Sequence, residues 1–370
     1  MSKKKFTFVD LFAGIGGFHV ALHSLGGHCV FASEIDKNAR LSYEANYKEI
    51  EPKLFAKDKF GNYLYFNEDI NDIVPFDVPD FDICCGGFPC QPFSVAGLKR
   101  GFDDTRGTLF FNIANLVREK IKAGSPPRVL FLENVRGLKN HDNGKTLQVI
   151  LATLEELGYK AKCEVLNAKY FGIPQNRERL FIIAWYKDLV KVDNFNFPYG
   201  ISEDGSTIFE KAKLKEGTLI TKVSDIFEPT EITIPYTISD RMWIGHQNRK
   251  LRNKQNGKGF GFSLFNANST YTSTISARYW KDGSEILIDQ SDKGLNPRTL
   301  TPVEAGRLQG YRIIGNGWED PDCANNRNYN DSNPEYKIVV SKKEAYRQFG
   351  NSVAIPVIKR IAEEIIKQLM

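Results

Sequence analysis

One cysteine of the chain stands in a setting suited to nucleophilic chemistry. Cys90 lies within Gly86-Gly87-Phe88-Pro89-Cys90-Gln91-Pro92, where two glycines and two prolines around one thiol predict a rigid, shaped loop. The loop follows a predicted strand, Phe81-Asp82-Ile83-Cys84, and ligands of α/β proteins bind beyond the carboxyl ends of such strands. A lone cysteine is more often a small buried hydrophobe, so the thiol decides nothing by itself.

An acid and a basic segment are predicted near the same edge. Glu133 follows the apolar run 129–132, so it should lie at a strand end beside the cysteine loop; the alternative is a helix-capping acid. In an extended segment Gln175, Arg177 and Arg179 share one face. Two cations and an amide on that face could donate hydrogen bonds to a phosphate or to the carbonyl of a base. The alternative is an exposed charged strand.

A glycine turn after the first predicted strand indicates an adenosine-type ligand. It runs from Asp10 to Gly17 as Asp-Leu-Phe-Ala-Gly-Ile-Gly-Gly, and glycines let a ligand approach the backbone closely. The turn half matches a dinucleotide fingerprint, with His19 at the third glycine position. Glu34 can accept both hydroxyls of a ribose. Asp69-Ile70 offers a carboxylate for the adenine amine and an apolar cover, although such an acid is more often an exposed carboxylate.

The elements that must position these groups alternate through the first half of the chain. Predicted strands are 6–11, 29–32, 81–84 and 129–132, and predicted helices are 18–22, 37–46, 108–122 and 146–157. This rhythm is typical of a mainly parallel sheet with helices on both faces. From about Asp193 the chain becomes rich in Gly, Asn, Ser and Thr, which predicts a second, irregular, β-rich lobe. Residues 353–369 repeat an apolar residue every fourth position, so this helix should pack onto the first lobe.

Composition excludes several classes of protein. The 370 residues carry a net charge of +5 and 41% hydrophobic residues, as in a globular chain with two lobes. No apolar run approaches the ~20 residues of a membrane span, and the basic N-terminus lacks the apolar core of a secretory signal. A cytoplasmic location with reduced cysteines is therefore expected. The six cysteines fit no zinc framework, so no metal is expected.

One stretch of the second lobe is strongly basic. Between residues 241 and 258 there are six basic residues and no acid, namely Arg241, Arg249, Lys250, Arg252, Lys254 and Lys258. A solvated basic face and a phosphate-contacting surface both explain this pattern.

Taken together, the chain resembles the cytosine-C5 DNA methyltransferases, in particular the compact bacterial enzymes of restriction-modification systems. The matching segments occur in the family's order. They are Asp10 to Gly17, Glu34, Asp69, Pro89-Cys90-Gln91, Glu133-Asn134-Val135, Gln175-x-Arg177-x-Arg179, Leu300 through Tyr311 and Gln348 through Val353. Three features depart from the pattern: 51–64 looks like an insertion, 312–336 is long and Asn-rich, and Ile35 stands where some members carry an aromatic residue.

The resemblance implies a fold and a division of labour. The fold is a doubly wound, mainly parallel, Rossmann-like sheet of the S-adenosylmethionine-dependent methyltransferases, with a smaller, irregular, β-rich target-recognition lobe. The implied domains are a catalytic and cofactor-binding lobe over 1–190, the target-recognition lobe over 191–297, a hinge over 298–334 and a return to the catalytic lobe over 335–370.

The resemblance also implies a covalent mechanism. The Cys90 thiolate attacks carbon 6 of a cytosine and makes carbon 5 nucleophilic. Glu133 contacts N3 and the 4-amino group, which requires a raised pKa in a dry pocket. Arg179 holds O2, and Arg177 and Gln175 support the site. A base then removes the hydrogen of carbon 5, and the cysteine is eliminated.

S-adenosylmethionine is the implied methyl donor, leaving S-adenosylhomocysteine. The residues implied to hold it are Phe12, Gly14, Gly16, Gly17, Glu34, Ile35, Asp69, Ile70, Pro89, Asn351 and Val353. The rival at the glycine turn is an NAD- or FAD-dependent oxidoreductase, which His19 at the third glycine position disfavours.

Double-stranded DNA is the implied substrate, and its target base must leave the stack. Predicted DNA contacts are Ser94, Lys99, Arg100, Arg106, Gln175, Arg241, Arg249, Lys250, Arg252 and Lys258, with base readout within 257–286. A monomer is expected, with a cognate restriction endonuclease as its functional rather than physical partner. Two further rivals are a catalytically inactive DNA-binding module, which intact Cys90 and Glu133 disfavour, and an enzyme that acts on tRNA.

Overall fold

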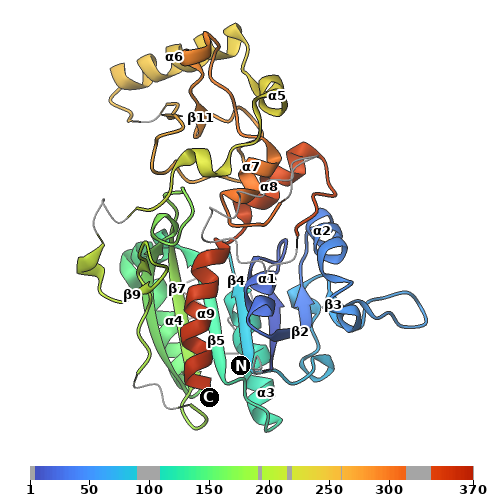
Figure 1. Cartoon of the computed structure of the whole chain (residues 1–370). Helices are drawn as coiled ribbons and strands as arrows, with labels where there is room; N and C mark the ends of the chain where they lie inside the picture. The colour runs from blue at the N-terminus through green and yellow to red at the C-terminus, as the bar shows by residue number, and fades with distance from the viewer. Residues whose placement is uncertain are drawn as a thin grey trace. The chain divides into compact units, whose positions relative to one another are not determined.

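The chain forms two compact units. A computed structural model describes residues 5–89, 109–190, 194–214, 219–259, 261–313 and 335–369 (Figure 1). The first unit comprises Met1–Leu166, Glu178–Pro198 and Ile358–Met370, and the second comprises Asn167–Arg177 and Tyr199–Val357. Within the described ranges, no helix has both the length and the apolar character that a membrane span needs.

A seven-stranded sheet forms the centre of the first unit, in the order β3-β2-β1-β4-β5-β7-β6. The strands are β1 Phe6–Leu11, β2 Gly27–Ser33, β3 Phe66–Asn67, β4 Ile83–Gly87, β5 Val129–Val135, β6 Tyr159–Asn167 and β7 Glu178–Tyr186. The pairs β1–β2, β1–β4, β2–β3 and β4–β5 are parallel, and β5–β7 is antiparallel. The predicted mainly parallel sheet is confirmed. The strand order reverses between β1 and β4, because β2 and β3 follow on one side of β1, and β4 and β5 lie on the other. In α/β sheets, ligands bind at the carboxyl ends of the strands at such a switch point.

Helices cover both faces of this sheet. They are α1 Gly17–Ser24, α2 Lys37–Tyr47, α3 Leu109–Lys122 and α4 Lys145–Glu156. Alternate residues of a strand face opposite sides. Leu130 and Leu132 join the core that α3 and α4 share, whereas Phe131 meets Phe18 of α1 with ring centroids 5.0 Å apart. Both faces of β5 are therefore buried, as expected for an interior strand of such a sheet.

The C-terminal helix α9, Ile355–Leu369, carries the chain back to the first unit. Ile361 and Ile365 are fully buried, and the guanidinium of Arg128 donates to the carbonyl of Leu369 at 2.5 Å. The predicted packing of this helix is confirmed. The return begins at Ile358 rather than at the predicted residue 335, because helix α8, Lys342–Asn351, contacts helix α7, Pro302–Arg307, within the second unit.

The second unit is irregular, as predicted, but the prediction that it is β-rich is wrong. Its strands are two-residue pieces, namely β8 Gly200–Ile201, β9 Thr207–Ile208, β10 Leu264–Phe265 and β11 Leu287–Ile288. Helix α5 is short, Thr230–Thr233, whereas α6 spans Asp240–Gln255. The buried residues of α6 are His246 and Asn253. Apolar periodicity cannot reveal a helix that packs through polar side chains.

Candidate active site

The turn after β1 is held in an unusual backbone conformation. Phe12, Gly14 and Gly16 all have positive φ, of 56°, 55° and 81°, and a Cβ on Gly16 would lie 2.2 Å from the ring of Tyr47. The Tyr47 hydroxyl lies 3.0 Å from the carbonyls of Ile15 and Gly16 and donates to them. The sequence did not single out Tyr47; its signal is the four-residue spacing of buried residues along α2. Gly17, also predicted to bind cofactor, begins α1.

Glu34 connects this turn to the end of β2. Its Oε2 accepts from the Gly14 amide at 2.7 Å and its Oε1 accepts from the Asp36 amide at 2.8 Å. Burial raises the pKa of this carboxyl, and the two amides oppose that rise. A Cβ built on Gly14 meets no atom within 4 Å. The predicted proximity of Glu34 to the glycine turn is therefore present, beside open space.

The end of β3 lies next to that of β2. The Glu34 amide donates to the carbonyl of Asn67 at 3.1 Å. Asp69 follows, and its Oδ1 accepts from the Asn71 amide at 2.9 Å and from the Asn71 side chain at 2.7 Å. Ile70 is buried, whereas Ile35 is 71% exposed. Four predicted cofactor residues (Glu34, Ile35, Asp69 and Ile70) thus occur at neighbouring strand ends.

Strand β4, which precedes the predicted cysteine loop in the sequence, pairs with β5, which carries the predicted acid. Gly87 of β4 is the register partner of Glu133 of β5, and the Asn134 side chain donates to the Phe88 carbonyl at 2.8 Å. Gly86 is required because a Cβ there would lie 2.2 Å from the Leu11 carbonyl oxygen. Pro89 is exposed. The predicted nucleophile Cys90 and the predicted DNA contacts Ser94, Lys99, Arg100 and Arg106 lie outside the described residues.

Glu133 forms an ion pair with Arg179 across β5 and β7. The Arg179 Nε lies 3.0 Å from Glu133 Oε1, and the two side chains are 19% and 10% exposed. Burial lowers the pKa of Arg179, and the charge of Glu133 opposes that change. The structure thus brings together the acid and the arginine that the sequence assigned to the reaction. The raised pKa expected for Glu133 stays a prediction.

Gln175 and Arg177 hold backbone segments of the second unit. The Arg177 guanidinium donates to the carbonyls of Gly350 at 3.2 Å and Ser352 at 2.5 Å. The Gln175 side chain donates to the Leu308 carbonyl at 2.7 Å and accepts from the Ile275 amide at 3.1 Å. Both side chains are buried. The geometry makes them positioning residues and gives no support to a DNA contact through Gln175.

Arg177 thereby orders a segment predicted to bind cofactor. Asn351 is exposed and Val353 is buried, on either side of Ser352. The Ser352 hydroxyl lies 2.8 Å from that of Tyr311, and the Gln309 side chain donates to the Phe349 carbonyl at 2.7 Å. Within the second unit, these contacts fix the backbone around Asn351.

The basic run forms helix α6 and the residues that follow it. Arg241, Lys250, Arg252 and Lys258 are exposed. Arg249 differs, because its Nη1 lies 2.8 Å from the Asp282 carboxylate. Lys250 also lies over the ring of Phe262, 4.2 Å from its centroid. The run therefore has several exposed cations, whereas Arg249 is paired with an acid of the second unit.

Known proteins share both the sequence and the fold. The model of a family described as C-5 cytosine-specific DNA methylase matches residues 6–367. Type II methyltransferase M.NlaX of Neisseria lactamica is 47% identical over 97% of this chain and 96% of its own. Type II methyltransferase M.HhaI of Haemophilus parahaemolyticus is 36% identical over 97% of this chain and 93% of its own.

Solved structures agree on the fold. The Dnmt2 methyltransferase of S. pombe superposes with a TM-score of 0.68 at 20% identity and covers 99% of both chains. The Entamoeba histolytica methyltransferase EhMeth gives 0.67 at 17% identity, with the same coverage. Given the family match over nearly the whole length and the relatives' identity, the chain belongs to the C-5 cytosine-specific DNA methylase family.

Proposed function

We propose that this protein methylates carbon 5 of a cytosine in a specific sequence of double-stranded DNA, through a transient bond between Cys90 and carbon 6. The observation that carries the proposal is the Glu133–Arg179 pair at the strand ends, in register with Gly87 of the strand that leads toward Cys90. The relatives named as Type II methyltransferases support the same reaction.

The pair suits one edge of cytosine. O2 and N3 are neighbouring acceptors on this base, and the 4-amino group is a donor. The Arg179 guanidinium only donates, so it would meet O2. A protonated Glu133 would donate to N3 while its other oxygen accepts from the 4-amino group. Thymine reverses the last two positions of this pattern, because its N3 donates and its O4 accepts.

The reaction proceeds through bonds that form and break in turn. The Cys90 thiolate bonds to carbon 6, and the electron pair of the C5–C6 double bond becomes available at carbon 5 to bond the methyl group. Glu133 stabilises this charge by protonating N3. Transfer of the methyl group would break its bond to the sulfonium and leave S-adenosylhomocysteine. The hydrogen of carbon 5 then leaves as a proton to a base, the C5–C6 double bond re-forms as the bond from sulfur to carbon 6 breaks, and N3 returns its proton to Glu133.

S-adenosylmethionine supplies an electrophilic methyl group carried on a sulfonium. Open space beside Gly14 and the acidic groups at the ends of β2 and β3 fit its adenosine part. Glu34 would accept from the ribose hydroxyls, Asp69 would accept from the adenine amine, and Phe12 and Ile70 would cover the ring. The remaining residues proposed for this pocket are Gly16, Gly17, Ile35, Pro89, Asn351 and Val353.

DNA enters as a duplex from which one base is extruded, at a cost of about a few kcal/mol. The exposed cations of α6 would neutralise phosphates, and the segments near it would read base edges. The proposed monomer would protect DNA from a restriction endonuclease that recognises the same sequence.

The test is direct mapping of 5-methylcytosine in unmethylated DNA incubated with the protein and S-adenosylmethionine. The wild-type chain should methylate one sequence motif. Cys90→Ser should bind DNA and cofactor yet transfer almost no methyl, while Cys163→Ser, at a half-buried cysteine of β6, should transfer normally. Full turnover by Cys90→Ser would overturn the covalent mechanism. Methylation of RNA alone, or tight nicotinamide binding without S-adenosylmethionine binding, would overturn the proposed function.

A further inference from the structure

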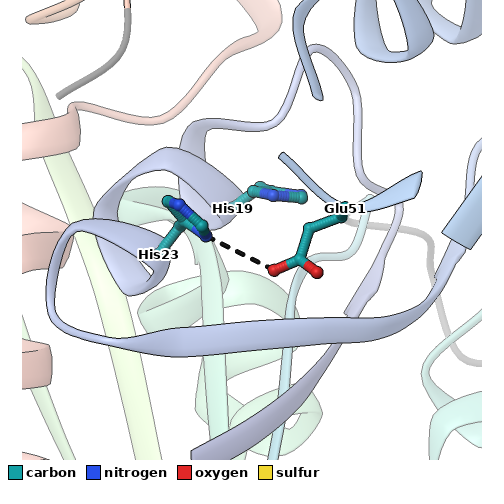
Figure 2. Close-up of side chains that lie close together, drawn as sticks. All are labelled: His19, His23 and Glu51. Atoms are coloured by element: carbon teal, nitrogen blue, oxygen red, sulfur yellow. Dashed lines mark ion pairs between the residues drawn. The ribbon is translucent and has the colours of Figure 1, made fainter. Parts of the chain in front are cut away.

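A cluster of histidines and one glutamate lies in the first unit, apart from the groups proposed for catalysis. Figure 2 shows His19 and His23 of α1 facing Glu51, and one ligand atom from each lies within 4.8 Å of the others. The Nδ1 of His23 is 3.4 Å from Glu51 Oε1. The Nδ1 of His28, on β2, is 3.2 Å from the same oxygen. Three of the chain's five histidines thus surround one carboxylate.

A hydrogen bond engages one ring nitrogen of His19 and, among the described residues, leaves the other without a partner. Its Nδ1 lies 2.7 Å from the Tyr43 hydroxyl, and that hydroxyl donates to Asp10 Oδ2 at 3.2 Å. With the single hydroxyl proton directed to Asp10, the Nδ1 of His19 is the donor to Tyr43 and its Nε2 carries a lone pair. This Nε2 is buried and, among the described residues, has no hydrogen-bond partner. A buried acceptor without a partner is costly to folding, which points to a missing ligand.

We propose that His19 Nε2, His23 Nδ1 and Glu51 Oε1 bind a divalent transition-metal ion of the zinc class. Bonds of about 2.0–2.2 Å from zinc to nitrogen or oxygen place tetrahedral ligands about 3.3 Å apart. The distance of 3.4 Å between Glu51 Oε1 and His23 Nδ1 matches that spacing. Imidazole ligands suit Zn²⁺, Ni²⁺ and Cu²⁺, whereas Mg²⁺ and Ca²⁺ prefer oxygen.

The surroundings of His19 have the form of a second coordination shell. A metal-bound histidine usually donates its other N–H to a group that fixes its orientation, which here is Tyr43 backed by Asp10. An ion-pair network alone explains His23, His28 and Glu51, but it leaves the buried Nε2 of His19 unexplained.

The site would brace the turn after β1. The ring of His19 stacks on that of Tyr47 with centroids 4.1 Å apart, and the Tyr47 hydroxyl donates to the carbonyls of Ile15 and Gly16. A bound ion would therefore link α1 to Glu51, which follows α2 in the chain, and would support the packing of His19 and Tyr47 against this turn. Glu51 also opens the segment 51–64, which departs from the compact family pattern, so the site is inferred for this chain rather than for the family.

Metal titration of the chelator-stripped full chain tests the proposal. Zn²⁺ is titrated against a chromophoric chelator, and Co²⁺ reports the ligand type by absorption. We expect one ion per chain, with tetrahedral cobalt bands and no thiolate charge-transfer band, which separates this site from the six cysteines. His23→Ala and Glu51→Gln should each lower the affinity at least about 100-fold, and Tyr43→Phe should lower it about 10–100-fold by removing the outer-shell contact.

His141→Ala is the matched control, because the Nδ1 of His141 contacts Thr146 Oγ1 at 2.7 Å outside the cluster. It should bind Zn²⁺ as the wild type does. Zn²⁺ should also raise the melting temperature of the wild type and of His141→Ala but not that of His23→Ala. Equal affinity in all variants, a thiolate band, or no binding by the wild type would overturn the proposal.

Discussion

Two of the molecule's arginine–glutamate pairs, one from each unit, differ in how completely they are enclosed. In the first unit Arg179 Nε lies 3.0 Å from Glu133 Oε1, and the side chains remain 19% and 10% exposed. In the second unit Arg298 meets Glu304 through two bonds, Nη1 to Oε2 at 2.7 Å and Nη2 to Oε1 at 2.8 Å. The side chains of this second pair are 4% and 0% exposed.

The surroundings explain the difference. Glu304 also accepts from the amides of Thr301 at 2.9 Å and Glu228 at 3.0 Å, so it completes the cap of α7 and ties two segments of the unit together. Glu133 instead stands at the carboxyl end of a sheet strand, where ligands bind. The same two residue types thus serve folding where backbone amides surround them, and are proposed to serve chemistry where they end strands.

Replacing Glu133 separates the two roles most strongly. Glu133→Gln keeps the side-chain shape but cannot deliver a proton to N3, so single-turnover methyl transfer should fall about 10²–10⁴-fold. Glu304→Gln is the control and should keep its rate per folded molecule. Near wild-type transfer by Glu133→Gln would remove this acid from the proposed mechanism.

Replacing the arginines should affect stability, and here the larger effect is expected in the second unit. Arg298→Met leaves a buried carboxylate without its partner, so the free energy of unfolding should fall by about 3–5 kcal/mol in urea titrations. Arg179→Met should cost less stability, because Glu133 keeps some contact with solvent. Equal losses in the two variants would show that enclosure does not distinguish the pairs.

Helix α6 also contains one exposed arginine and one that is paired with an acid, and a smaller difference in effect is expected between them. Arg252 is exposed, whereas Arg249 is paired with Asp282. Arg252→Ala should weaken DNA binding and reduce the slope of log affinity against log salt by about 1, as expected for one lost phosphate contact. Arg249→Ala should change that slope less. An unchanged slope for Arg252→Ala would remove this residue from the proposed DNA surface.

The smallest effect concerns Glu34, whose pKa burial raises above the ordinary 4.5. The folded state then binds a proton more readily than the unfolded state. This carboxyl's contribution to the free energy of unfolding should therefore decrease as pH rises from 4.5 through the folded pKa, and level off above it. Unfolding titrations at a series of pH values should show this component in the wild type and not in Glu34→Gln. A pH-independent difference between the two proteins would contradict the prediction.

The sequence predicts the positions of the strand ends well because short-range signals define them. The apolar runs before Glu34 and Glu133 mark strands, and parallel strands bring their carboxyl ends to one edge. The glycine turn is recognisable for the same reason, since positive φ at Gly14 and Gly16 favours that residue type.

The features that the sequence does not predict depend on contacts between residues that lie far apart in the chain. The partners of Arg177 are backbone carbonyls more than ninety positions away, and backbone groups leave no mark in a sequence. Helix α6 buries His246 and Asn253 instead of an apolar stripe. In the sequence, His19 is notable only because it stands at the third glycine position of a dinucleotide fingerprint. Only the fold shows that it lies beside His23 and Glu51.

The central claim is the bond between Cys90 and the target base, and trapping that bond tests it most directly. A duplex with the methylated sequence can carry fluorine at carbon 5 of the target cytosine. A base can remove a proton from carbon 5 but cannot remove fluorine in the same way. The elimination of Cys90 is therefore blocked, and the adduct should persist after methyl transfer. We predict that mass spectrometry will find the wild-type chain joined to this DNA through the peptide that contains Cys90, and no such species for Cys90→Ser. Methyl transfer without an adduct, or an adduct on another cysteine, would contradict the account.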